Sequence, residues 1–164
     1  MSTDDWQSAL IPIFGGLNAD ELFPVVNLVI PAYLLLAFFP RWKHTHTVAL
    51  ITAAFYGVVY LMSLIAINTG GEQPEGDFGS LGGLMKLFRN PTVMFAGWVH
   101  YIAFDLLVSR GVSLDALDRG ASTMVYTVVV VPCMFGCLMF GPVGYIVYLS
   151  LRPIVLPLAK PKSE

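Results

Sequence analysis

Residues 90–110 read NPTVMFAGWVHYIAFDLLVSR, an apolar stretch of membrane-spanning length with a histidine and a carboxylate near its middle. Pro91 suits the first turn of a helix and Asn90 is a good helix cap, so the sequence predicts that a helix begins here. From Pro91 to Val108 this helix would rise about 27 Å, close to the roughly 30 Å thickness of a bilayer's hydrocarbon core. The stretch therefore predicts a transmembrane helix that carries two ionisable groups.

Those two groups fall on different faces of the predicted helix. Trp98, Tyr101 and Asp105 share one stripe, whereas His100 lies beside two alanines that would let a neighbouring helix approach closely. An ionisable side chain costs a few kcal/mol or more inside a membrane, so each one is a functional candidate by default. The alternative is that both are polar struts that hold the helices together by hydrogen bonds.

The composition is that of an integral membrane protein. Of 164 residues, 56% are hydrophobic and 12% charged, about half the charge of an average soluble domain, and the mean hydropathy is +0.71. A net charge of -2 offers no basic surface for nucleic acid, which we exclude as a partner. Cys133 and Cys137 lie four residues apart in an apolar run, and we interpret them as core thiols. The N-terminal sequence resembles neither a signal peptide nor a plastid presequence, so we expect a prokaryotic chain or a processed one.

The predicted fold is all-α: one membrane domain over residues 1–164, with four transmembrane helices in a bundle. A short interfacial segment, 81–88, precedes the third helix, and Trp6–Phe14 is expected to lie at the membrane surface. Internal prolines should kink the first helix. The fourth is about 43 Å long if straight, so it should be kinked or broken near Pro132 or Gly141. Residues 111–122 are expected to form a loop. The four predicted spans are 22–39, 48–67, 91–108 and 123–151.

The candidate site residues are the polar and aromatic groups of these spans and their ends. His100 and Asp105 are the candidate catalytic residues. The candidate substrate-binding residues are Asn27, Asn90, Trp98, Tyr101 and Arg110. The structural alternatives for these residues are helix capping, packing and charge anchoring. No nucleophile elbow, HExxH or phosphate-binding glycine loop occurs. We expect neither metal nor cofactor, and we interpret His44 and His46 as a polar loop, since metal sites need three or four ligands.

Four stretches carry a family resemblance: FPVVNLVIPAYLLLAFFPRW at 23–42, GSLGGLMKLFRNPTVMFAGWVHYIAFDLLVSR at 79–110, DALDRG at 115–120 and FGPVGYIVYLSLR at 140–152. Together they resemble the ABA4-like family, which includes the plant membrane protein needed to make neoxanthin and has bacterial and algal members. The resemblance implies isomerisation of the epoxide violaxanthin to the allenic neoxanthin, in a plastid membrane (thylakoid or envelope) or, for bacterial members, the inner membrane.

That implied reaction needs one acid and one base. Our hypothesis assigns His100 as the base and Asp105, in its protonated form, as the acid, with Trp98 and Tyr101 stacking on the polyene. Five residues separate the pair, about 7.5 Å along a helix, which suits a substrate bridging them in an intramembrane groove. The expected partners are membrane lipids and a carotenoid or other apolar molecule. The alternative function is a noncatalytic carotenoid- or lipid-binding subunit of a larger photosynthetic membrane complex.

Overall fold

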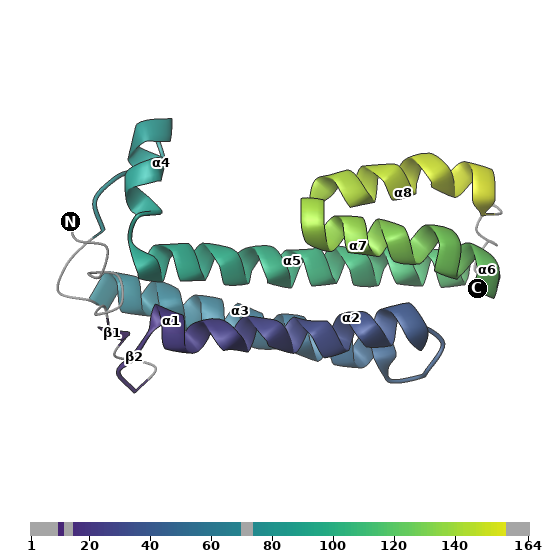
Figure 1. Ribbon diagram of the computed structural model, residues 1–164, viewed down its shortest axis with the longest axis horizontal. Coiled ribbons are helices and arrows are strands. Elements are labelled where there is room, and N and C mark those ends of the chain that lie inside the picture. The colour runs from purple at the N-terminus through teal and green to yellow at the C-terminus, as the bar shows by residue number, and fades with distance from the viewer. Residues whose placement is uncertain (1–9, 12–14, 70–73, 157–164) are drawn as a thin grey trace, which may run out of the picture. The chain divides into compact units, whose positions relative to one another are not determined.

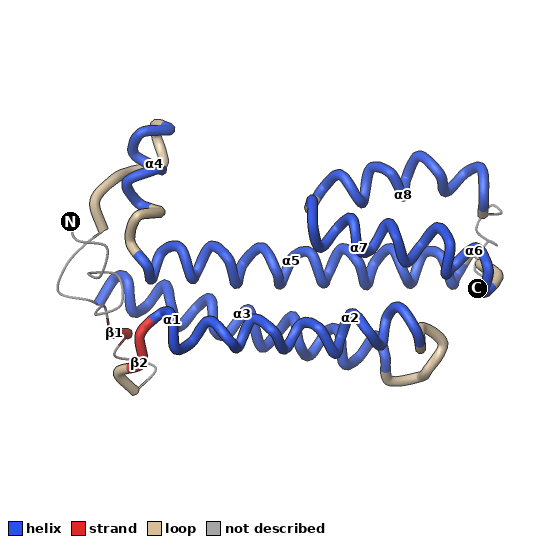
Figure 2. The backbone as a smooth tube through the Cα atoms, in the orientation of Figure 1, coloured by secondary structure: helices blue, strands red, loops and turns tan. Residues whose placement is uncertain are grey.

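The structure is a computed structural model that describes residues 10–11, 15–69 and 74–156, and helices dominate it (Figure 2). Most of the expected surface segment Trp6–Phe14 lies outside the described residues. In chain order the elements are β1 (Leu10–Ile11), β2 (Leu17–Asn18), α1 (Ala19–Leu22), the 3₁₀ helix η3 (Phe23–Leu28), α2 (Val29–Phe38), α3 (Thr45–Thr69), α4 (Leu81–Leu87), α5 (Pro91–Asp118), α6 (Thr123–Val125), the π-helix η4 (Tyr126–Val130), α7 (Val131–Phe140) and α8 (Pro142–Val155). The two strands form one short antiparallel pairing.

Four helical segments are long and apolar enough to cross a membrane, which confirms the predicted all-α membrane fold. They are Ala19–Phe38, Thr45–Thr69, Pro91–Asp118 and Thr123–Phe140. Large apolar side chains along these segments are exposed, as lipid contact requires. Examples are Leu34, Phe38, Ile51, Val58, Phe104, Val128 and Phe135.

The chain divides into two compact units. The first contains the residues up to Leu28 and Ala54–Tyr101, and the second contains Val29–Ala53 and the residues from Ile102 onward. Helices α3 and α5 therefore contribute to both units. His100 belongs to the first unit and Asp105 to the second.

In the first unit, the start of the first span is irregular because of Pro24, which lacks the N–H that a helix needs. The chain passes from α1 into the 3₁₀ helix η3, where two carbonyl groups accept hydrogen bonds from the Tyr56 hydroxyl of α3, at 3.1 Å for Val25 and 2.8 Å for Val26. Tyr56 is fully buried. The residue expected to serve freed backbone groups, Asn27, is exposed instead.

Helix α4, also in the first unit, forms at the expected interfacial segment and ends at Leu87. Ser80 caps it by accepting a hydrogen bond from the Gly83 N–H at 3.0 Å. Gly83 and Leu87 are its buried residues, and α4 turns away from the axis of α5 (Figure 1). A Cβ atom at Gly97 of α5 would lie 2.8 Å from the ring of Phe88, so the corner between α4 and α5 depends on a glycine.

In the second unit, α5 continues ten residues beyond the predicted end at Val108, so the loop expected at 111–122 is limited to residues 119–122. Val112 and Ala116 are buried, which holds the added turns against the core of the unit. Asp115 forms an ion pair with Arg119 at 3.1 Å, one turn later. Burial and this pairing stabilise a helix whose charged residues had suggested a loop.

The end of α2 shows how the second unit satisfies a backbone group that proline leaves free. In a continuing helix the carbonyl of Leu36 would accept a hydrogen bond from residue 40, but Pro40 has no N–H. The buried hydroxyl of Tyr126 in η4 donates to that carbonyl at 2.9 Å, and it also hydrogen-bonds Ser113 of α5. Tyr126 therefore joins η4 to both α2 and α5.

The predicted fourth helix, 123–151, is broken rather than kinked. A π-helical turn precedes Pro132, and α7 ends at Gly141, whose φ of 55° favours glycine. Helix α8 then runs back beside α7 (Figure 1). The two helices touch backbone to backbone, because a Cβ atom at Gly136 would lie 3.1 Å from the Cα atom of Gly144.

Candidate functional site

Asp105 lies midway along α5, on a helix that is about 42 Å long. Its side chain is half-buried, and the turn between α7 and α8 is close by, since a Cβ atom at Gly141 would lie 3.9 Å from Asp105 Oδ1. Among the residues that the structure describes, no hydrogen bond or ion pair to this carboxylate is found.

Three polar side chains form a cluster next to Asp105 within the second unit. Asp105 interacts electrostatically with Tyr33 of α2 and Cys137 of α7. Ser109, one helical turn after Asp105, joins them: its Oγ lies 3.0 Å from the Tyr33 hydroxyl and 3.4 Å from the Met134 carbonyl oxygen. Cys137 also hydrogen-bonds Ser109.

Sequence reasoning did not include Tyr33, Ser109 or Cys137 among the site residues. The spacing of Ser109, four residues after Asp105, is a signal that could have found it, because residues so spaced share a helix face. Tyr33 and Cys137 lie on other helices and carry no such signal. Cys133 and Cys137 are buried and free, as expected for core thiols.

His100 lies in the first unit, where aromatic rings surround it. Its ring centroid is 5.1 Å from that of Tyr60 on α3 and 6.4 Å from that of Tyr101. The side chain is exposed, on a span whose surroundings are lipid. The rings flank the imidazole and leave part of it accessible.

Two of the five candidate substrate-binding residues have structural contacts. Asn90 caps α5, its Oδ1 accepting hydrogen bonds from the N–H groups of Thr92 at 3.0 Å and Val93 at 3.2 Å. Arg110 donates from Nε to the His46 carbonyl at 2.8 Å. These contacts match the cap and anchoring roles that sequence reasoning gave as alternatives.

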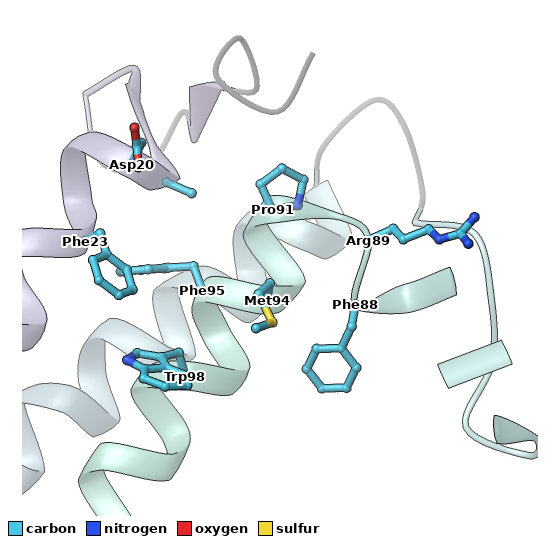
Figure 3. Close-up of a pocket in the computed structure, with 9 residues that line it drawn as sticks. Asp20, Phe23, Phe88, Arg89, Pro91, Met94, Phe95 and Trp98 are labelled. Atoms are coloured by element: carbon cyan, nitrogen blue, oxygen red, sulfur yellow. The ribbon is translucent and has the colours of Figure 1, made fainter. Parts of the chain in front are cut away.

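The other three candidates are exposed. Tyr101 is 63% exposed and Asn27 is on the surface of η3. Trp98 lines a cavity of about 380 Å³ in the first unit, together with residues of α1, η3 and the corner between α4 and α5 (Figure 3). Its ring centroid is 6.5 Å from that of Phe23.

Residues from two of the quoted motifs meet in the second unit. Asp115 and Arg119 come from DALDRG, and Tyr148 and Arg152 from the α8 motif. The Tyr148 hydroxyl donates to Asp115 Oδ2, and Arg152 lies 3.5 Å from Asp115 Oδ1. This arrangement joins α8 to the end of α5, which is a structural role.

His44 lies in the turn before α3, whereas His46 lies in the first turn of α3 and not in a loop. No group of three or more histidine, cysteine or acidic side chains comes together within the described part of the chain. His46 Nε2 lies 3.1 Å from the Pro40 carbonyl, and the His44 ring packs edge-on against Trp42.

Residues 21–148 match the protein family described as ABA DEFICIENT 4-like. The matched range begins within α1 and ends within α8, and it contains every candidate site residue. Neither the curated proteins nor the solved structures include a match.

Proposed function

Because the chain belongs to the ABA DEFICIENT 4-like family, we propose that it isomerises a xanthophyll epoxide to an allenic alcohol, as in conversion of violaxanthin to neoxanthin. The family is associated with neoxanthin and abscisic acid biosynthesis. The reaction changes no oxidation state overall and transfers one proton to the substrate and one from it. It therefore asks the protein for an acid and a base in apolar surroundings.

The observation that carries the proposal is the unpaired carboxyl group of Asp105. Burying an ionisable side chain in a membrane helix is costly, and a purely structural carboxylate would be expected to have a partner. Asp105 instead lies midway along α5, beside the hydroxyl and thiol groups of Tyr33, Ser109 and Cys137. In its protonated form Asp105 serves as the acid.

The proposed reaction balances in atoms and charge. Asp105 gives its proton to the epoxide oxygen as the ring carbon–oxygen bond breaks. The neighbouring polyene carbon loses a proton to His100, and the electron pair of that carbon–hydrogen bond completes the allene. The proton on His100 must return to Asp105 before the next turnover. His100 is assigned as the base because it lies five residues before Asp105 on α5 and its imidazole is exposed.

The proposed setting is a plastid membrane or a bacterial inner membrane, with lipids around the four spans. Trp98 and Tyr101 are proposed to stack on the polyene, since both rings are exposed on α5. No metal or cofactor enters the proposed reaction.

Production of the protein in a violaxanthin-containing bacterium tests the proposal. Liquid chromatography of the extracted pigments should show an allenic product with the wild type. Asp105→Asn and His100→Ala should each reduce the product to the level of cells without the protein. Asp118→Asn and His44→Ala are matched controls, because these side chains are exposed at a helix end and in a loop, and they should retain activity.

Two results would contradict the proposal. One is unchanged pigment composition with membrane-inserted wild-type protein. The other is retention of activity in Asp105→Asn. Helical content in detergent, compared among all variants, separates loss of chemistry from loss of fold.

A second function is favoured by the cavity at Trp98, whose walls are mainly apolar. As a noncatalytic carotenoid- or lipid-binding subunit of a larger photosynthetic complex, the protein would copurify with pigment and leave its composition unchanged. The same experiment distinguishes the two functions.

A further inference from the structure

We infer that the cavity in the first unit binds the hydroxylated ring at one end of a xanthophyll, and that Asp20 recognises its hydroxyl group. The inference rests on the proposed function for the class of ligand, and it adds a binding site that lies apart from the proton-transfer residues. Its evidence is the position, size and chemistry of the cavity.

The cavity lies at the end of two spans. It is lined by Ala19 and Asp20 at the start of the first span and by Pro91 at the start of α5. The ends of a transmembrane helix are where a membrane meets water, so a ligand here can have an apolar body and a polar tip.

The walls suit an apolar ring. Phe23 and Trp98 lie on one side and Phe88 on the other, with Met94 between them (Figure 3). Phe88 can take this position because Gly97, beneath its ring, has no side chain. Aromatic and methionine side chains adapt well to flat or cyclic apolar groups.

The size limits what can enter. About 380 Å³ falls within the roughly 300–1,000 Å³ range of small-molecule sites. A rod-like polyene as long as the bilayer core, about 30 Å, does not fit in that volume. An end ring does, and the polyene would then leave the cavity.

The rim carries one acidic and one basic side chain, Asp20 and Arg89. Asp20 lies on α1, on the side of Phe23, while the Arg89 side chain extends away from the aromatic residues (Figure 3). A carboxylate accepts a hydrogen bond from a neutral hydroxyl and repels phosphate. Asp20 can therefore accept a hydrogen bond from a hydroxyl group on the bound ring, and a phospholipid whose headgroup pairs with Arg89 is the competing occupant that the experiment below distinguishes.

Fluorescence of Trp98 tests the inference. The chain has three tryptophans, so Trp6→Phe and Trp42→Phe in the full-length protein leave Trp98 as the reporter. The probes are zeaxanthin and β-carotene in nanodiscs, because they share one polyene and differ in the ring hydroxyl groups. Zeaxanthin has no epoxide and cannot undergo the proposed isomerisation.

We expect zeaxanthin to quench Trp98 with an apparent Kd at least about fivefold lower than that of β-carotene. Asp20→Leu should remove this difference and leave quenching by β-carotene unchanged. Phe23→Ala should weaken binding of both pigments. Phe55→Ala is its matched control, because Phe55 is similarly exposed, lies in the same unit and does not line the cavity.

Equal quenching by the two pigments would overturn the inference, as would an unchanged preference in Asp20→Leu. The inference would also be overturned if a brominated phospholipid quenched Trp98 fluorescence and zeaxanthin did not reduce that quenching. Asp105→Asn separates the inference from the proposed function, because it should abolish isomerisation and retain zeaxanthin binding. Binding without isomerisation in the wild type would contradict the proposed function alone, and isomerisation without binding at Trp98 would contradict this site alone.

Discussion

Replacing Gly144 with alanine tests how closely α8 approaches α7. A Cβ atom at this position would lie 2.6 Å from the carbonyl oxygen of Cys133, and it would also collide with backbone atoms of Gly136 and Cys137. Backbone atoms cannot rotate away as the end of a side chain can. Relief of all three contacts to an ordinary distance of about 3.5 Å requires α8 to move outward by roughly 1–1.5 Å.

The cost of that movement can be estimated from general values. Overpacking of a close contact destabilises a protein by about 1–3 kcal/mol, and a gap of up to 1 Å forfeits a quarter to a half of each van der Waals contact. Replacing a helical glycine returns about 0.5–1 kcal/mol of backbone entropy. We therefore expect Gly144→Ala to lower the free energy of unfolding by about 2 kcal/mol.

Alanine substitutions at other helical glycines provide the comparison for the stability effect of Gly144→Ala. A Cβ atom at Gly57 or Gly111 meets nothing within 4 Å apart from the nearby backbone of its own helix, so alanine there should leave stability unchanged or raise it by up to about 1 kcal/mol. Gly136→Ala should fall between these variants and Gly144→Ala, because its Cβ atom would lie 3.1 Å from Gly144 Cα. Gly136→Ala should also cost less in the Gly144→Ala background, where α8 has already moved.

The assay is reversible unfolding in mixed micelles with increasing sodium dodecyl sulfate, followed by circular dichroism. Equal stability of Gly144→Ala and Gly111→Ala would refute the close approach of the two helices. If the losses of unfolding free energy in Gly136→Ala and Gly144→Ala simply add in the double variant, the idea that the two glycines share one contact is refuted.

Three further changes test single interactions in the same assay. Tyr148→Phe removes a hydrogen bond to the partly exposed carboxylate of Asp115 and should cost about 1.5 kcal/mol, whereas Tyr145→Phe should cost nothing measurable. Asn90→Ala removes the cap of α5 and should cost about 1 kcal/mol, which Asn90→Asp should restore; a costless Asn90→Ala would contradict the cap. Tyr56→Phe leaves two carbonyl groups of η3 without their buried donor and should cost about 1–3 kcal/mol; equal stability would show that water replaces the hydroxyl.

The start of α5 could be predicted from local chemistry, whereas its end could not. Asn90 and Pro91 determine the first turn by capping and by a preset φ angle, and the structure confirms both. The end depends on tertiary contacts. The i,i+4 spacing of Asp115 and Arg119 is visible in the sequence, but the contacts of Asp115 with Tyr148 and Arg152 of α8 are not.

The sequence predicts where the fourth helix breaks, at Gly141, but it does not predict that α8 then returns along α7. A glycine followed by proline indicates where a helix ends. The sequence does not give the sign of φ there, and the positive value is what accompanies the return of α8 along α7. The cluster at Asp105 was missed for a similar reason, since Tyr33 and Cys137 approach it from other helices.

The return of α8 along α7 decides which side of the membrane the chain reaches at its described end. Arg152, near the end of α8, lies against Asp115, near the end of α5. The short connection after Asp118 and the exit from α8 thus face the same aqueous compartment. A topology reporter joined behind α8 should accordingly give the same sidedness as a thiol probe on a cysteine introduced at Ser122.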